Sequence, residues 1–282
     1  MKYFKIAMFF SLVFFFASCE DFFDQTTTVD IPPHTPQLGV TALWLNEGGG
    51  RLVTVFASVG VLEDESSSAV SGAEITLTEN GDPLVTFAED SSVKGFYRPV
   101  SSITLIPGNK YELTVSATNF ETVKATQIMP NLPTIKDASF EKANNKLQIS
   151  ISDGEGDDFY VIGMTPADSS SFASSYIYDS GSLADESGLD YRRVILKDET
   201  FAGEDVSQTF EAYLNGSTSV DSVKVNLFNV SSDYYRLDRT YAASDNADGN
   251  PFAEPVILHR NFDNGYGVFA LGNKSSKVVA IE

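Results

Sequence analysis

The chain has 282 residues, of which 42% are hydrophobic, and its one cysteine is Cys19. A single cysteine excludes an intrachain disulfide and a thiolate metal cluster. The formal net charge is −20 at pH 7, and it is near −22 beyond residue 18 because Lys2 and Lys5 lie before that point; a surface this acidic repels nucleic acid, so no nucleic-acid partner is expected.

Residues 1–18 have the order of regions that is typical of a secretory signal peptide: two lysines, the apolar run Ile6–Phe16, and two small residues. The apolar run is shorter than the roughly 20 residues of a membrane-spanning helix. Phe16–Cys19 (Phe-Ala-Ser-Cys) resembles a bacterial lipobox. We therefore expect cleavage before Cys19 and acylation of that residue, because several acyl chains anchor a protein stably where one does not. The alternative is an ordinary signal peptide in which Cys19 is coincidental.

Residues 19–36 are expected to form a flexible, lipid-anchored tether. Between Phe22 and Pro36 the chain has a threonine run, three prolines and no apolar periodicity, a composition that lifts a folded body off the membrane. Glu20 and Asp21 directly follow the cysteine. Acidic residues in that place resemble the surface-export signal of lipoproteins from the Bacteroidota. The resemblance implies an outer-membrane protein that faces the cell exterior.

Residues 37–130 are predicted to form a β-sandwich domain. The run 52–56 is β-branched and aromatic, and in the runs 73–78 and 111–117 apolar and polar residues alternate, which places every second side chain on a core face. Asn-Gly and Pro-Gly turns separate the runs. Three segments resemble the carboxypeptidase-regulatory or transthyretin-like sandwich of surface proteins, an Ig-like arrangement of strands: 70–77, 95–97 and 106–115.

A second, antiparallel β-rich domain is predicted over residues 131–282. Two prolines within the segment 129–133 end a strand and mark the boundary between the domains. Residues 167–190 are rich in Ser, Asp and Gly and are expected to form long loops. Strands are predicted where β-branched and apolar residues run together or alternate, at 147–151, 159–164, 194–196 and 223–227.

One short amphipathic helix is predicted over about residues 230–243. Asp233 suits its first turn, and Arg236 and Arg239 are placed toward its C-terminal half, where the helix dipole favours cations. Apolar residues at helical spacing define one face, which we interpret as core: Val230, Tyr234, Leu237 and Tyr241.

The C-terminal third carries the most specific pattern, a tyrosine-rich helix start, an Asn-Pro-Phe loop and a Gly-x-Gly-x-Phe strand. The residues that carry it are Tyr234, Tyr235, Asn250, Pro251, Phe252, Glu254, Pro255, Asn264, Gly265, Gly267 and Phe269. With the lipobox and the first sandwich, this pattern resembles the Bacteroidota lipoprotein family catalogued as domain of unknown function 4249. The resemblance covers nearly the whole mature chain.

The family resemblance implies an outer-membrane lipoprotein encoded beside a TonB-dependent outer-membrane transporter. That transporter is the expected partner, besides the lipid membrane that acylated Cys19 would enter. No reaction is established for the family. The chain departs from the family pattern at His259-Arg260-Asn261, where members tend to have Ser-Asn, so the role of His259 is open.

We expect neither an enzyme nor a cofactor from the catalytic signals in the chain. His34 lies in the tether, and a lone His259 beside Arg260 is more typical of a half-exposed strand residue than of a base. Residues 91–94 match Ser-x-x-Lys and residues 244–246 match Ser-Asp-Asn, but no Lys-Thr-Gly completes the set of penicillin-binding enzymes.

The loop 153–158 is a candidate calcium site. It offers four carboxylates, and hard oxygen ligands at alternate positions suit Ca²⁺. The loop lacks the distal Gly and Glu of the helix-loop-helix calcium motif, so a solvated turn is the alternative. The candidate ligands are Asp153, Glu155, Asp157 and Asp158. Paired carboxylates for glycoside cleavage stay open, as do aromatic residues for sugar stacking such as Trp44, Tyr176 and Tyr178.

These observations favour a non-catalytic accessory or ligand-binding lipoprotein that works with a TonB-dependent transporter. A surface adhesion or structural module is the first alternative, because the sandwich can act as a spacer. A hydrolase with a carboxylate site is the second alternative.

Overall fold

A computed structural model describes residues 33–45, 50–60, 62–63, 68–168, 174–178, 184–215 and 220–282. The predicted signal peptide, Cys19 and most of the tether lie outside the described residues. The body from Thr35 to Glu282 forms one compact unit and is described by itself.

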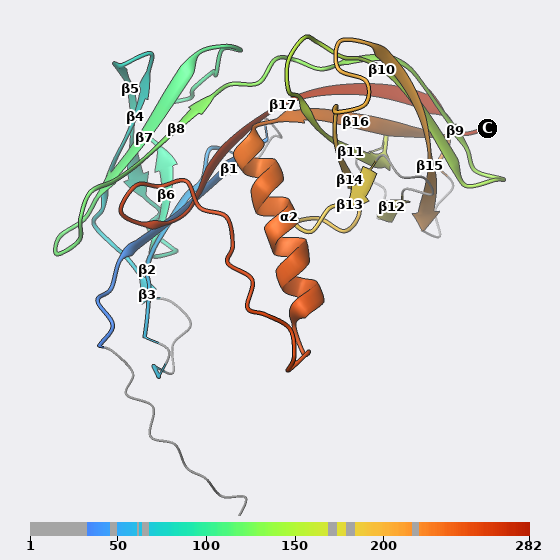
Figure 1. Cartoon of the computed structure of the whole chain (residues 1–282). Helices are drawn as coiled ribbons and strands as arrows, with labels where there is room; N and C mark the ends of the chain where they lie inside the picture. Colours follow the sequence, from blue (N-terminus) through green and yellow to red (C-terminus); the bar gives the residue numbers. More distant parts are fainter. Residues whose placement is uncertain are drawn as a thin grey trace, which may run out of the picture. The chain divides into compact units, whose positions relative to one another are not determined.

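Two β-sheets and one helix make up the described body (Figure 1). The first strands of the large sheet are β1 Leu38–Trp44, β2 Val53–Ala57, β3 Ser68–Ala69, β4 Glu74–Glu79, β5 Asp82–Glu89, β6 Phe96–Pro99, β7 Lys110–Ser116 and β8 Val123–Ile128. Its later strands are β11 Phe159–Pro166, β13 Ala184–Glu186, β14 Val194–Lys197, β16 Ser222–Val230 and β17 Tyr266–Ala280. The order is β13-β14-β11-β16-β17-β1-β2-β6-β5-β4-β7-β8, and β3 pairs with β2.

The smaller sheet is antiparallel and has four strands in the order β12-β15-β10-β9. The strands are β9 Thr134–Glu141, β10 Lys146–Ser152, β12 Ser174–Tyr178 and β15 Asp205–Asn215. The helix is α2, Ser232–Ala247, which begins directly after β16.

The long strand β17 pairs with an early strand, β1, and with a late strand, β16. Its first residues pair with β1 in parallel, from Gly39 opposite Tyr266 to Trp44 opposite Leu271. Its later residues pair with β16 in antiparallel fashion, from Gly272 to Ala280. Strands from both predicted domains therefore share one sheet, and the boundary between residues 130 and 131 stays a prediction.

Three apolar clusters form the core. The first gathers the inward residues of β1, β2 and β4–β8, and it includes Phe262, Phe269 and Leu271 from the C-terminal part of the chain. The second lies between the small sheet and one face of β11, β14 and β16. The third lies on the other face of these strands, where Val161 and Phe228 contact Tyr234 of α2. Alternation along β11 explains both faces, because Tyr160 and Val161 point to opposite sides of the sheet.

Trp44, a candidate for sugar stacking, is buried and does not serve that role. Its side chain is 2% exposed, and its ring lies 5.1 Å from the ring of Phe269 and 5.9 Å from that of Phe87. The indole Nε1 donates a hydrogen bond to the Leu52 carbonyl at 2.8 Å. The sequence left this role open, and the structure excludes it for Trp44 because the alternation of β1 places the side chain on the core face.

The prediction of a mostly β protein with one helix near residues 230–243 is confirmed. The predicted core face of the helix is partly wrong. Val230 belongs to β16, Tyr241 is 44% exposed, and Asp238 is buried beside Tyr234. The helix also extends to Ala247, so Arg236 and Arg239 lie in its first half and its last turn holds no basic residue.

Residues 167–190, expected to be loops, contain two short strands among the described residues, β12 and β13. Their apolar residues are too few to predict a strand from periodicity. The transthyretin-like arrangement of the first strands stays a prediction, since the strand order here continues through β1 into β17.

Candidate functional site

The family-pattern residues gather on α2 and on the segment that returns from it. Figure 1 shows α2 pointing away from the sheets, with the chain turning at its far end and running back beside it to β17. The helix start, the turn and the entry into β17 therefore form one structural unit, which we call the helix-loop projection (residues 231–265).

Two tyrosines attach the start of the projection to the sheet. Tyr234 is 4% exposed and belongs to the third apolar cluster. The ring of Tyr235 lies 4.8 Å from the ring of Phe159 on β11. The tyrosine-rich pattern is therefore a packing feature at this point in the structure.

Asp233 is the centre of a polar network between the helix and the returning segment. Its Oδ1 shares a hydrogen bond with His259 Nε2 at 2.6 Å. Its Oδ2 accepts hydrogen bonds from Gln127 Nε2 at 2.6 Å and from Asn261 Nδ2 at 3.0 Å. Burial alone would raise the pKa of Asp233, but the hydrogen bonds from Asn261, Gln127 and His259 outweigh it and lower that pKa.

The same network fixes the returning segment by its backbone. Asn261 donates to the Phe269 carbonyl at 2.8 Å and accepts from the Phe269 amide at 2.9 Å. The amide of His259 donates to Thr240 Oγ1 on the helix at 3.0 Å. His259 lies in an extended segment that is not a strand, which corrects the sequence expectation. Its hydrogen bonds to Thr240 and Asp233 tie the segment to α2, so we interpret His259 as a structural residue.

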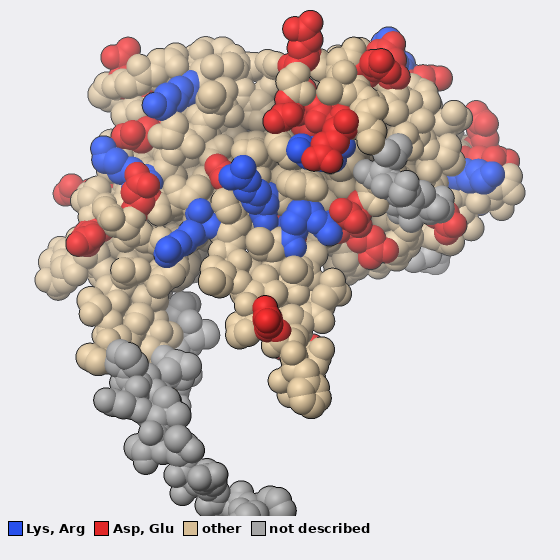
Figure 2. Space-filling model, viewed as in Figure 1, with Lys and Arg blue, Asp and Glu red and all other residues tan. Residues whose placement is uncertain are grey.

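The turn of the projection presents apolar side chains to solvent. Phe252 is 94% exposed and Ile257 is 85% exposed. The side-chain carbonyl of Asn250 accepts the Phe252 amide at 3.1 Å, which holds Phe252 in a fixed turn. Figure 2 shows charged side chains spread over the rest of this face, while the end of the projection is mostly uncharged.

A hollow of about 410 Å³ lies between the end of α2 and the returning segment. Its lining combines acidic and apolar residues: Tyr241, Ser244, Asp245, Ala247, Asp248, Ala253, Glu254, Pro255 and Val256. Glu254 and Pro255 of the sequence pattern are thus brought to one hollow with the helix end. Pro251 is exposed beside Phe252 and does not line it.

The last family-pattern residues set the entry into β17. Asn264 and Gly267 have positive φ values of 59° and 93°. A Cβ on Gly265 would lie 2.7 Å from the Leu38 carbonyl oxygen. Phe269 is fully buried against Trp44. These positions are required by backbone geometry and packing rather than by chemistry.

The loop 153–158 lies beside Asp198, an acidic residue that the sequence did not suggest as part of the site. Carboxylate oxygens of Asp153, Asp158 and Asp198 all lie within 4.8 Å of one another. Glu155 and Asp157 are exposed and outside this cluster. Asp198 is 1% exposed and follows β14, 40 residues away from Asp158, so sequence spacing gave no signal for it. The calcium hypothesis stays a prediction.

Protein donors contact each carboxylate of the cluster. Asp153 accepts from Tyr160 Oη and from the Gly203 amide, Asp158 accepts from Asn229 Nδ2 at 2.8 Å, and Asp198 accepts from the Asp158 amide at 2.8 Å. Burial, followed by the charges of neighbouring carboxylates, raises the pKa values of Asp158 and Asp198. These hydrogen bonds hold the loop 153–158 in its place in the fold, and the three neighbouring carboxylates repel one another when they are ionised.

The fold is that of a mostly β protein from which the helix-loop projection extends. The chain belongs to the family described as "Domain of unknown function (DUF4249)", whose model matches residues 24–278. The resemblance stated from the sequence is thereby confirmed, while an origin in the Bacteroidota stays a prediction. A search of curated proteins found no match to this chain. Within the described residues, no helix is both long and apolar enough to span a membrane.

Proposed function

We propose that the chain is an outer-membrane lipoprotein, anchored at Cys19 and facing the cell exterior, that acts as a non-catalytic partner of a TonB-dependent transporter. The lipobox and the family resemblance support the location and the class of partner. The observation that carries the docking role is the exposed apolar turn of the helix-loop projection, with Phe252 at its end.

Exposed apolar side chains on a rigid turn suit a protein interface. A large aromatic residue that becomes buried on binding contributes strongly to affinity. Phe252 and Ile257 are both more than four-fifths exposed in the free chain. The contacts of Asn250 and of the Asp233 network hold the turn in place before binding, which lowers the entropy lost on association.

The charges around the turn indicate the kind of partner. Asp245, Asp248 and Glu254 lie at the hollow beside it. Carboxylates next to an apolar tip disfavour insertion among anionic lipid headgroups and favour a protein socket with basic groups at its rim. An exposed surface of a transporter barrel supplies such a socket in this proposal.

The test is a co-purification of the tagged full-length chain from native membranes dissolved in mild detergent. We expect a stoichiometric TonB-dependent barrel, identified by mass spectrometry. The double variant Phe252→Ser, Ile257→Ser should recover at least tenfold less of it. The control Leu132→Ser changes an apolar residue that is 59% exposed elsewhere and should recover as much as the wild type.

A solitary lipoprotein would overturn the proposal and move the interpretation to an adhesion or structural module. If a barrel stays bound to the double variant, the proposed partner is supported but the docking role of the turn is contradicted.

A further inference from the structure

A second surface, on the small sheet, has the composition of a ligand site. Tyr176 and Tyr178 of β12 and Glu211 and Tyr213 of β15 line an open groove of about 480 Å³. The strand register pairs Tyr176 with Tyr213 and Tyr178 with Glu211, so all four side chains share one face. Residues between them, such as Ile177, are buried on the other face.

Tyr191 extends this surface from a neighbouring turn. Its ring is stacked on that of Tyr176, with the centroids 5.9 Å apart and an angle of 27° between the planes. The side chain is 65% exposed. We call Tyr176, Tyr178, Tyr191, Glu211 and Tyr213 the tyrosine surface.

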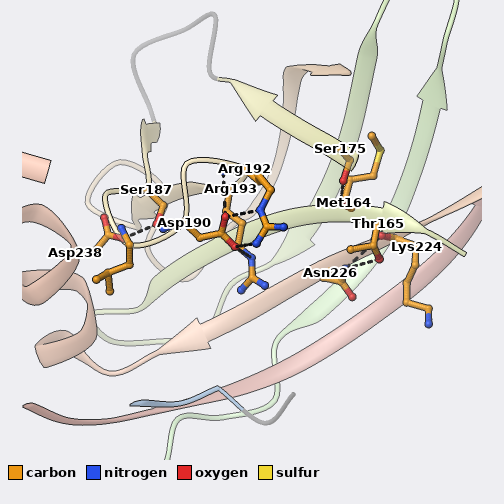
Figure 3. A network of polar contacts seen from close by, with 11 residues as sticks. Met164, Thr165, Ser175, Ser187, Asp190, Arg192, Arg193, Lys224, Asn226 and Asp238 are labelled. Atoms are coloured by element: carbon orange, nitrogen blue, oxygen red, sulfur yellow. Dashed lines mark hydrogen bonds and ion pairs between the residues drawn. The ribbon is translucent and has the colours of Figure 1, made fainter. Parts of the chain in front are cut away.

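The turn that carries Tyr191 is fixed by ion pairs and hydrogen bonds (Figure 3). Asp190 accepts from Arg192 Nε at 2.8 Å and from Arg192 Nη2 at 3.1 Å, and it pairs with Arg193 Nε at 3.1 Å. The Asp190 amide in turn donates to Ser187 Oγ at 3.2 Å. The ring of Tyr191 is thus positioned before any ligand arrives.

Charged groups of both signs lie at the tyrosine surface. Glu211 accepts a hydrogen bond from Tyr213 Oη at 3.2 Å, and Lys146 lies opposite it on β10, between Glu211 and Glu141 of β9. Opposite charges side by side do not select a strongly charged ligand. Among the described residues, no aliphatic side chain lines the groove, so it does not suit an acyl chain.

The remaining chemistry is that of partly exposed aromatic rings with hydroxyl and carboxylate groups between them. The C–H faces of a pyranose ring are apolar and flat enough to stack on tyrosine, while its hydroxyls donate to carboxylates and exchange hydrogen bonds with phenols. A chain of such rings matches a row of tyrosines that is open along a groove.

We propose that the tyrosine surface binds a neutral oligosaccharide, with pyranose rings on Tyr176 and Tyr191 and hydroxyl groups on Glu211 and Tyr213. The inference goes beyond the docking role proposed above, because it names a class of ligand and a separate surface that binds it.

The test is binding of the full-length chain to a broad printed array of neutral oligosaccharides, followed by titration with the best-bound glycan. The detergent is a polyoxyethylene ether, because sugar-headed detergents would compete. We expect Tyr191→Ala to weaken binding at least tenfold and Tyr191→Phe, which keeps the ring, to stay within threefold of the wild type. Tyr266→Ala, at a tyrosine that is 40% exposed at the start of β17, is the matched control and should bind as the wild type does.

Thermal unfolding of each variant separates a lost site from a lost fold. Binding to no neutral glycan on the array, or binding that Tyr191→Ala and Tyr176→Ala leave unchanged in folded protein, would overturn the inference. If a barrel co-purifies but no glycan binds, only the proposed ligand class is contradicted. If a glycan binds but no barrel co-purifies, only the proposed transporter role is contradicted.

Discussion

The backbone at Gly267 is a point where one residue decides the pairing of two strands. Its φ of 93° lies in the region that L side chains rarely adopt, and an added Cβ would lie 2.0 Å from the Val40 carbonyl oxygen on β1. The obstacle is backbone, so no side chain can move aside. The glycine therefore allows β1 and β17 to approach each other.

We predict that Gly267→Ala lowers the free energy of unfolding by at least about 2 kcal/mol, from dihedral strain and the clash together. Gly81→Ala is the matched control, because Gly81 has a φ of 96° and nothing within 4 Å of an added Cβ. It should cost about 1 kcal/mol, the strain alone. Urea denaturation of both variants measures the difference, and equal losses would contradict the role of the close approach.

At the scale of elements, α2 holds the turn before β14 through a buried acid. Asp238 is fully buried, and its carboxylate accepts hydrogen bonds from Ser187 Oγ and from the amides of Gly188 and Leu189 at 3.1 and 3.2 Å. Figure 3 shows Asp238 on the helix beside Ser187 of this turn. Because the same turn carries Tyr191, Asp238 links the helix to the tyrosine surface.

Asp238→Ala should destabilise the protein by about 2–3 kcal/mol, because it leaves buried donors without an acceptor. Hydrogen exchange should speed up at the Gly188 and Leu189 amides. Asp185→Ala removes an exposed carboxylate that pairs with Arg239 and should change stability by less than about 1 kcal/mol. Unchanged exchange at the two amides in Asp238→Ala would show that the turn does not depend on the helix.

The acidic cluster of Asp153, Asp158 and Asp198 connects two loops and makes stability depend on pH. A carboxyl whose pKa is higher in the folded than in the unfolded chain adds stability below its unfolded pKa of about 3.9, and this stability is lost as the pH rises through the folded pKa. Asp158 and Asp198 are such groups. Above the folded pKa they are ionised beside other carboxylates, so their contribution to stability is then unfavourable.

Asp198→Asn should raise the free energy of unfolding at pH 7 by roughly 1 kcal/mol, and this gain should shrink as the pH falls toward the unfolded pKa of about 3.9, below which the acid is protonated in both the folded and the unfolded chain. The asparagine oxygen can still accept the Asp158 amide. Glu155→Gln, at an exposed acid in the same region, is the control. Denaturation curves between pH 4 and 7 give the comparison, and a variant that is less stable than the wild type at pH 7 would contradict the prediction.

At the scale of the whole molecule, the sequence predicted the elements better than their partners. Alternation in 73–78 and 111–117 placed β4 and β7 correctly because one face of each is buried. Alternation does not say which strand lies alongside, so the pairing of β1 with β17 could not be predicted. It was also silent on Asp238, since periodicity ranks positions by hydrophobicity and a buried acid breaks that ranking.

The candidate sites show the same limit. The loop 153–158 was found from its acids, but Asp198 reaches them only through the pairing of β11 with β14. The tyrosine surface depends on Tyr213 in β15, a strand that the sequence did not predict. His259 was noted as a departure from the family pattern, and its partner Asp233 was noted only as a residue of the first helical turn.

The parallel pairing of β1 with β17 has a consequence for how the chain folds. Synthesis delivers β1 long before the residues of β17 that pair with it, so one edge of β1 stays open until β17 has been made. Closing so long a loop makes folding slow, because much chain entropy is lost before the contact forms. A chain shortened before Tyr266 would lack β17, which lies between β1 and β16 in the sheet. Each of these two strands would then have an unpaired edge. Such edges recruit other strands, and we expect truncated chains to aggregate rather than persist as a smaller fold.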